Sequence, residues 1–221
     1  IGCLDTATSG SYKINGKETI ELSKDQLSDL RSQKFGFIFQ RYNLLSSLTA
    51  AENVALPAIY AGMSQEKRLS RAKQLLEKLG LGDKWQNKPS QLSGGQMQRV
   101  AIAKELIRDK EILIADEIDT GLDCGVARSL CNMLNHIAHK EKKTVIVISH
   151  NLINIELYDN VVVLVKDSNK TGRIAYHGSP YQMKTFFQVH DYVDILMKLN
   201  SEDEGGENLA DFYIDQYERS I

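Results

Sequence analysis

Two short segments constrain the fold of this chain more than any other feature. The first is Leu92-Ser93-Gly94-Gly95-Gln96, a turn that leads into a stretch with helical periodicity. The second is the apolar run Ile112–Ala115, which ends in Asp116 and Glu117. A turn that opens a helix presents free backbone N–H groups and a positive dipole end to an anion. Two carboxylates at the tip of a buried strand suit a site for Mg²⁺ and a nucleotide, so we expect a phosphate-binding turn and a metal-binding strand end.

A phosphate loop of the form Gly-x-x-x-x-Gly-Lys-Ser/Thr is missing from the 221 residues. The Lys and Ser/Thr of such a loop supply most of the grip on the β- and γ-phosphates and on Mg²⁺. We therefore expect the chain by itself to bind ATP weakly or not at all. Because the first residue is Ile rather than Met, we also expect the sequence to begin inside a longer polypeptide.

The composition is that of an ordinary globular protein, with 42% hydrophobic and 25% charged residues. A formal net charge of −2 gives no basic footprint, so nucleic acid is not an expected partner. No apolar run approaches the roughly 20 residues that would span a bilayer, and we identify no signal peptide. The three cysteines form no paired framework, which suits a reducing compartment.

Buried-strand patterns alternate with helical patterns, which predicts an α/β core with a parallel sheet. We expect helices over 24–33, within 49–81, over 96–108 and 126–139, and strands over 34–40, 112–115 and 144–150. The run 144–149 is β-branched and does not alternate, which predicts a fully buried strand. Hairpins are expected within 10–22, around an Asn-Gly turn, and from 161–165 with 173–176. An amphipathic piece over 209–217 follows an acidic break; we favour a surface helix over a linker to another domain.

In their order along the chain, these segments resemble the motifs of ATP-binding cassette (ABC) ATPases, in particular the macrolide-export and lipoprotein-release type. Phe37–Leu45 resembles the Q-loop, Pro89–Gln96 the signature region, and Ile112–Glu117 the Walker B strand. The resemblance extends from residue 1 to about residue 180. It implies an α/β fold of the P-loop NTPase type, with a parallel sheet core, an inserted helical subdomain and an N-terminal antiparallel remnant.

The resemblance assigns catalytic and metal-binding roles to four residues. It implies that Asp116 holds Mg²⁺ and that Glu117 is the catalytic base for attack of water on the γ-phosphate of ATP. Gln40 would reach both the Mg²⁺ and the attacking water, since an amide both accepts and donates hydrogen bonds. His150, at the end of a strand, matches the switch histidine that hydrogen-bonds the γ-phosphate.

Further residues are implied to bind ATP across a dimer. The turn residues would contact the γ-phosphate of a nucleotide held mainly by a partner subunit; they are Ser93, Gly94, Gly95 and Gln96. Glycine permits a close approach of the backbone to the phosphate. Asp123, in Gly121-Leu122-Asp123, matches the D-loop that crosses the dimer interface.

One departure from the family pattern follows the Walker B carboxylates. The family reads Asp-Glu-Pro-Thr where this chain has Asp116-Glu117-Ile118-Asp119. Replacing Pro frees φ at Ile118 and adds a backbone donor there, and Asp119 is expected to place a third carboxylate near the metal. A similar Asp-Glu-x-Asp pattern occurs in the ABC ATPase of iron–sulfur cluster assembly.

The resemblance also implies how the chain is organised and where it works. We predict an N-terminal part of the ATPase core (1–48), a helical signature subdomain (49–95), the remainder of the core (96–190) and a C-terminal extension or linker (191–221). The expected activity is ATP hydrolysis that drives export, with a homo- or heterodimeric ATPase partner. A transmembrane permease subunit or fused domain would dock on the helices at 49–90, at the cytoplasmic face of the membrane.

Two other functions stay open. The Ile118-Asp119 variation also fits a soluble ABC ATPase that works in assembly or repair without a transporter. The missing phosphate loop also fits a regulatory fragment that dimerises but does not bind nucleotide.

Overall fold

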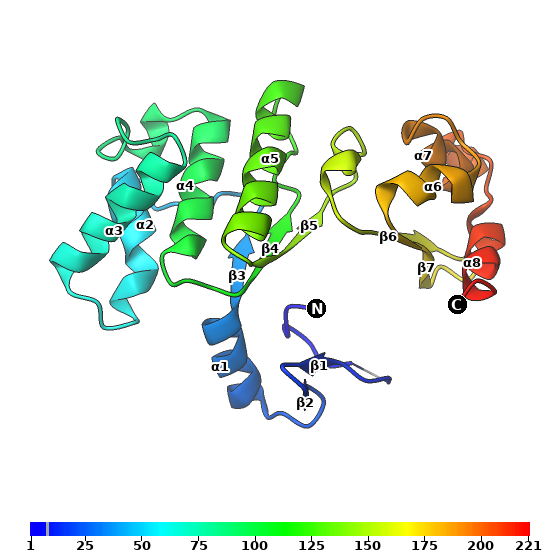
Figure 1. Ribbon diagram of the computed structural model, residues 1–221, viewed down its shortest axis with the longest axis horizontal. Coiled ribbons are helices and arrows are strands. Elements are labelled where there is room, and N and C mark those ends of the chain that lie inside the picture. Colours follow the sequence, from blue (N-terminus) through cyan, green and yellow to red (C-terminus); the bar gives the residue numbers. More distant parts are fainter. Residues whose placement is uncertain (8) are drawn as a thin grey trace. The chain divides into compact units, whose positions relative to one another are not determined.

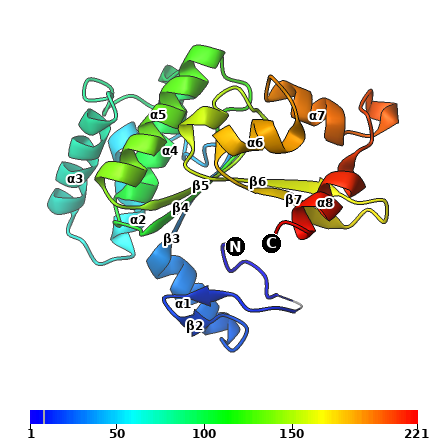
Figure 2. The ribbon, with the colours of Figure 1, turned by 45° about the vertical axis from the view of Figure 1, so that its right-hand side comes forward.

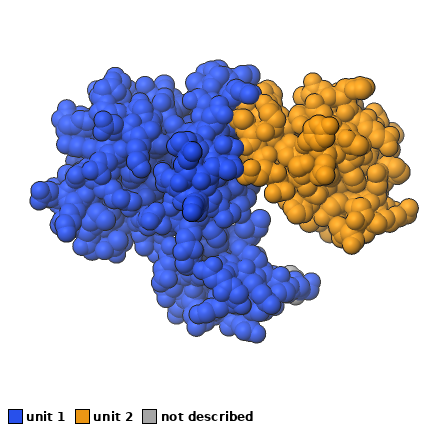
Figure 3. Space-filling model, viewed as in Figure 1, with its two compact units in different colours: residues 1–149 blue, residues 150–221 orange. Residues whose placement is uncertain are grey.

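The structure is a computed structural model that describes residues 1–7 and 9–221 (Figure 1). The chain forms two compact units, Ile1–Ser149 and His150–Ile221, which Figure 3 distinguishes by colour. We describe each unit by itself. The boundary between the units falls inside the predicted segment 96–190, and the predicted limits at residues 48, 95 and 190 stay predictions.

A three-stranded parallel sheet forms the centre of the first unit. Its strands are β3 (Phe35–Ile38), β4 (Ile112–Asp116) and β5 (Thr144–Ile148), in the order β3-β4-β5. Helix α4 (Gly94–Leu106) contacts β3, and helix α5 (Cys124–Lys140) contacts β5, as Figure 2 shows. The sheet and its helices confirm the α/β core with parallel strands.

Side chains of β4 alternate between two apolar cores, because successive residues of a strand point to opposite faces of the sheet. Leu113 and Ala115, both 0% exposed, belong to the core shared with α4 and α5. Ile114 belongs to a smaller core with residues of the N-terminal segment. The central strand is therefore covered on both faces, as its continuous apolar pattern predicts.

Strand β5 is less buried than the sequence predicts. Thr144 and Ile148 are exposed, and the three residues between them are only partly buried. In the described part of the chain β5 pairs with β4 alone, so it is an edge strand. The run of β-branched residues predicts the strand correctly. The prediction that this strand is fully buried is wrong, because burial depends on neighbours that the local sequence does not specify.

A group of helices packs against the core on the side of α4. Helices α2 (Ala50–Ile59) and α3 (Gln65–Lys78) contact each other and α4, and a 3₁₀ turn, η1 (Pro89–Gln91), precedes α4. Thr49 begins α2 with a capping box to Glu52, as a Thr-x-x-Glu sequence favours. The buried Asn53 binds the preceding loop, since its Oδ1 accepts from Leu45 N at 2.7 Å. The predicted helical stretch is thus two helices joined by a turn.

The N-terminal segment contains a short hairpin and helix α1 (Lys24–Lys34). Strands β1 (Lys13–Ile14) and β2 (Lys17–Glu18) pair antiparallel. Asn15 and Gly16 join them with φ angles of 51° and 78°. Positive φ at both central residues is what a type I′ turn needs, so the Asn-Gly hairpin is confirmed.

The second unit is built on an antiparallel hairpin. Strand β6 (Val161–Lys166) pairs with β7 (Gly172–Gly178), with an irregularity after Val163. The remaining elements of the unit are η2 (Ile155–Leu157), α6 (Pro180–Phe187), α7 (Val193–Leu199), η3 (Glu202–Glu204) and α8 (Ala210–Glu218). Helix α8 contacts β7 and buries three of its residues, so the last amphipathic piece is a packed surface helix, as favoured.

None of the described helices combines the length and apolar character that crossing a bilayer requires.

Candidate nucleotide-binding site

The turn before α4 is a helix N-cap that leaves backbone donors free. Ser93 Oγ accepts a hydrogen bond from Gln96 N at 3.3 Å, and Ser93 N donates to Gln96 Oε1 at 2.9 Å. This capping box gives Ser93 and Gln96 roles within the chain. Gly94 and Gly95 occupy the first two helical positions, whose N–H groups have no partner inside a helix. These two N–H groups therefore suit an external anion.

Close packing explains why both positions are glycine. A Cβ added to Gly95 would lie 2.4 Å from Val126 Cγ1. A Cβ added to Gly94 would lie 3.0 Å from Tyr42 Oη and 3.2 Å from Leu122 Cδ2. The turn is thus in contact with the segment after Gln40 and with the segment around Asp123. Sequence reasoning gave these glycines only a phosphate-binding role and missed this packing.

We expect Gly95→Ala to destabilise the protein by about 1–3 kcal/mol, because the added methyl overpacks the contact with Val126. The double variant Gly95→Ala/Val126→Ala should lose less than the sum of the two single variants, since it removes the clashing Cγ1. Urea unfolding of the four proteins measures the coupling. Strict additivity would contradict the contact.

The two candidate carboxylates, Asp116 and Glu117, lie at the end of β4, where the chain leaves the strand. Asp116 is the last residue of β4 and is exposed, although the strand before it is buried. Glu117 is partly buried and has a φ of 47°, an uncommon value for a residue other than glycine. Its N–H donates to Ile148 O at 2.9 Å, which fixes the turn against β5. Such strained positions are concentrated at functional sites.

The two residues that depart from the family pattern have structural roles. Ile118 is 2% exposed and belongs to the core that contains α4 and α5. Asp119 is buried, and its carboxylate oxygens lie 3.0 and 3.1 Å from the Ser149 hydroxyl, which donates to them. Among the described residues no group of three or more His, Cys, Asp or Glu side chains is arranged to hold a metal. Asp119 thus accepts from the residue that follows β5, and its expected place near a metal stays a prediction.

The remaining predicted residues lie at the ends of elements. Gln40 is exposed, two residues after β3. Asp123 is exposed at the N-cap of α5, where its Oδ1 accepts from Val126 N at 2.9 Å. His150 is exposed and is the first residue of the second unit. The structure therefore places the Ser93 turn in contact with the segment after Gln40 and with the segment around Asp123. The predicted role of His150 stays a prediction.

The residues present fit part of a site for Mg²⁺ and ATP. An exposed carboxylate at Asp116 and an amide at Gln40 are oxygen ligands of the kind that Mg²⁺ prefers. The free N–H groups at the start of α4 suit a phosphate group. The chain lacks the phosphate loop that would hold the rest of the nucleotide.

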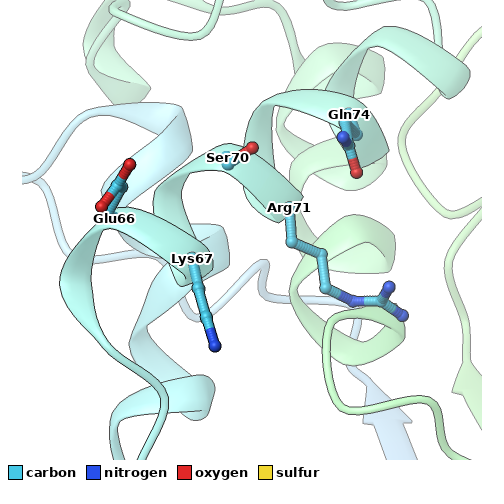
Figure 4. Close-up of a pocket in the computed structure, with 5 residues that line it drawn as sticks. All are labelled: Glu66, Lys67, Ser70, Arg71 and Gln74. Carbon is cyan, nitrogen blue, oxygen red and sulfur yellow. The ribbon is translucent and has the colours of Figure 1, made fainter.

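A surface hollow of about 340 Å³ lies elsewhere, on α3. Figure 4 shows its lining side chains along one helix: Glu66, Lys67, Ser70, Arg71 and Gln74. Arg71 is held by the chain, since its Nε donates to Ile107 O at 3.0 Å. None of the residues predicted to bind the nucleotide lines this hollow.

Comparison with known proteins identifies the family. The model of the family described as "ABC transporter" matches residues 2–120, more than half of the chain. The chain belongs to the ABC transporter family. The matched region contains Gln40, the Ser93 turn, Asp116 and Glu117, whereas Asp123 and His150 follow it.

Curated relatives of this ABC chain include proteins named "Macrolide export ATP-binding/permease protein MacB". The one from Aggregatibacter actinomycetemcomitans is 65% identical over 167 residues, which are 76% of this chain and 26% of the relative. The one from Mannheimia succiniciproducens is 62% identical over 167 residues, which are again 76% of this chain and 26% of the relative. The chain thus spans about a quarter of the length of the curated relatives that it matches.

Solved ABC cassettes share the fold. One is described as the dimeric structure of a post-hydrolysis state of the ATP-binding cassette MJ0796 bound to ADP and Pi. It is 38% identical, has a TM-score of 0.64, and the match covers 73% of this chain and 72% of that one. This likeness confirms the expected fold class.

Proposed function

We propose that this chain is the ATPase part of an export-type ABC transporter, which closes as a dimer around Mg-ATP. The observation that carries the proposal is the contact of the Ser93-Gly94-Gly95 turn with Tyr42 and with Leu122 and Val126. This contact joins a set of donors for phosphate to the segments that follow Gln40 and surround Asp123. The export function is supported by the printed names of the MacB relatives.

In this proposal Glu117 positions and activates the attacking water, and Asp116 and Gln40 hold the metal ion. A bound Mg²⁺ would supply positive charge beside the phosphate oxygens. A carboxylate at Glu117 can accept the proton of water, and the fixed turn at this residue holds the carboxylate in place. The free N–H groups of Gly94 and Gly95 would donate to the γ-phosphate of ATP that a partner subunit holds, and His150 would donate a hydrogen bond to a γ-phosphate.

The second half of each nucleotide site comes from another molecule in this proposal. The Ser93 turn and Asp123 would serve ATP that a partner ATPase subunit holds, and the partner would be identical or related. The dimeric ABC cassette with 38% identity supports this arrangement. A permease, as a separate subunit or a fused domain, would contact the helices at 49–90, and the ATPase would lie at the cytoplasmic face of the membrane.

We expect the 221-residue chain to bind Mg-ATP weakly, with a dissociation constant of about 1 mM or above, because it lacks a phosphate loop. A longer form that supplies this loop should bind Mg-ATP in the micromolar range. Isothermal titration calorimetry of both forms measures the difference. Tight binding by the short chain would contradict the expectation.

The same longer form separates the alternative functions. Failure of the longer form to bind Mg-ATP would favour a regulatory fragment that does not use nucleotide. Binding and hydrolysis without any copurifying membrane protein would favour an ATPase of assembly or repair. Stimulation of hydrolysis by a copurified permease would support the transporter.

A further inference from the structure

A second hollow, of about 360 Å³, lies at the end of the sheet opposite the candidate nucleotide residues. Its lining includes Phe35, the first residue of β3, and Lys110, which precedes β4. The candidate residues Gln40 and Asp116 lie at the carboxyl ends of the same two parallel strands. The two places are therefore separate parts of the first unit.

The charges around this hollow are mostly positive. Four cationic side chains line it, and Glu105 is the only acidic one; the cations are Arg31, Lys104, Arg108 and Lys110. Burial raises the pKa of the Glu105 carboxyl. Two serine hydroxyls, of Ser28 and Ser32, complete the polar lining.

The Lys110 residue is buried along most of its length, but its ammonium nitrogen is not among the fully buried polar atoms and reaches the surface where the residue lines the hollow. Its side chain belongs to a residue that is only 4% exposed, and within the described residues its ammonium group makes no hydrogen bond or ion pair. Burial lowers the pKa of this lysine. An anion in the hollow would gain a charge-assisted hydrogen bond from this ammonium group.

The turn that presents Arg108 and Lys110 is held from outside the hollow. Asp109 has a φ of 53°, and its Oδ1 lies 2.7 Å from Lys143 Nζ. The same Nζ donates to Lys110 O at 2.8 Å. Glu111 pairs with Lys34. Asp109 and Glu111, the acidic neighbours of Lys110, are thus each paired with another lysine. Neither acid lines the hollow, whereas Arg108 and Lys110 both do.

The two arginines keep donors for a ligand. Arg31 donates through one nitrogen to Cys3 O. Both terminal nitrogens of Arg108 make long contacts of 3.4 Å to one acceptor, Ser32 Oγ. A guanidinium group has five N–H donors in a plane, a geometry that matches the oxygens of a phosphate. Phe35 and Phe37, with ring centroids 6.1 Å apart, add an apolar wall.

We propose that this hollow binds a small soluble phosphate monoester that carries an aromatic group. Lys110, Arg108 and Arg31 would bind the phosphate, and the Phe35–Phe37 wall would contact the aromatic group. The volume lies at the lower end of the range of small-molecule sites. The site is independent of the proposed ATP site, because it uses none of the residues assigned there.

Calorimetric titration of the chain with phenyl phosphate, inorganic phosphate and phenol tests the proposal. We expect phenyl phosphate to bind most tightly, inorganic phosphate more weakly and phenol not measurably. Lys110→Met and Arg108→Gln should each weaken phenyl phosphate about 10-fold or more, because each removes a hydrogen-bonding charge. Lys140→Met, at an exposed helical lysine, is the matched control and should leave binding unchanged.

Thermal unfolding gives a second measurement that does not depend on the activity of the protein. Phenyl phosphate should raise the Tm of the wild type but not that of Lys110→Met. The proposal is overturned if the wild type binds neither phosphate probe, or if both variants bind as it does. The proposal is also overturned if Ser93→Ala weakens the binding of phenyl phosphate and Lys110→Met does not, since the ligand would then bind at the proposed ATP site.

Discussion

Glu117→Gln should lower the rate of ATP hydrolysis by about 10²- to 10⁴-fold in a form of the protein that contains a phosphate loop. Glutamine has nearly the same size as glutamate, and its amide oxygen can still accept from the Thr120 hydroxyl, which lies 3.5 Å from Glu117 Oε2. It cannot accept a proton from water. The variant should therefore keep its fold and its affinity for Mg-ATP but fail to turn over.

The same variant should accumulate as an ATP-bound dimer, because the dimer can no longer open by hydrolysing its nucleotide. Steady-state phosphate release measures turnover, and gel filtration with and without Mg-ATP measures the dimer. Glu66→Gln, at an exposed residue of α3, is the matched control and should hydrolyse ATP at the wild-type rate. Unchanged turnover of Glu117→Gln would show that Glu117 is not the catalytic base. A monomer at saturating Mg-ATP would contradict the dimeric arrangement.

Phe187→Ala should destabilise the second unit by about 3–5 kcal/mol. Phe187 is 0% exposed and lies among aromatic rings, with its ring centroid 4.7 Å from that of Tyr213 and 5.1 Å from that of Phe186. Its carbonyl accepts a hydrogen bond from Tyr213 Oη at 3.1 Å. Truncation leaves a cavity where α6 meets α8 and β7, and a loss of this size is a large fraction of the stability of a small domain.

Amide hydrogen exchange in α6, β7 and α8 measures this loss, because all the ring contacts of Phe187 lie within residues 150–221. The fluorescence of Trp85, the single tryptophan, reports on the first unit in the same sample. Phe212→Ala is a matched control, since Phe212 is 56% exposed on α8 and should cost far less. Equal losses for the two variants would show that Phe187 does not anchor the core of this unit.

Local patterns in the sequence predict the kinds and order of the main elements. The Asn15-Gly16 turn, the apolar run of β4 and the helical periodicity of α4 and α5 each depend on residues within a few positions of one another. The Ser93 capping box has the same local character, although the sequence reading did not single out Gln96 for it. The signature and Walker B motifs also predict the family, which comparison with known proteins confirms.

Burial and side-chain partners are less predictable because they depend on residues far apart in the sequence. The full burial of β5 is wrong since no strand pairs with its second edge in the described residues. The hydrogen bond from Ser149 to Asp119 joins residues thirty positions apart, and no local pattern indicates it. Lys143 and Lys34 bind the acidic neighbours of Lys110, and no local pattern indicates this.

The sequence by itself determined the family, the α/β class and the order of the three strands of the parallel sheet. These follow from motifs and periodicities, which are properties of short stretches of chain. Only the tertiary structure decided that Gly94 and Gly95 must be small, that Asp119 binds Ser149 and that Lys110 lines a hollow. The physical reason is that steric contact and desolvation act through space, between side chains that the fold brings together.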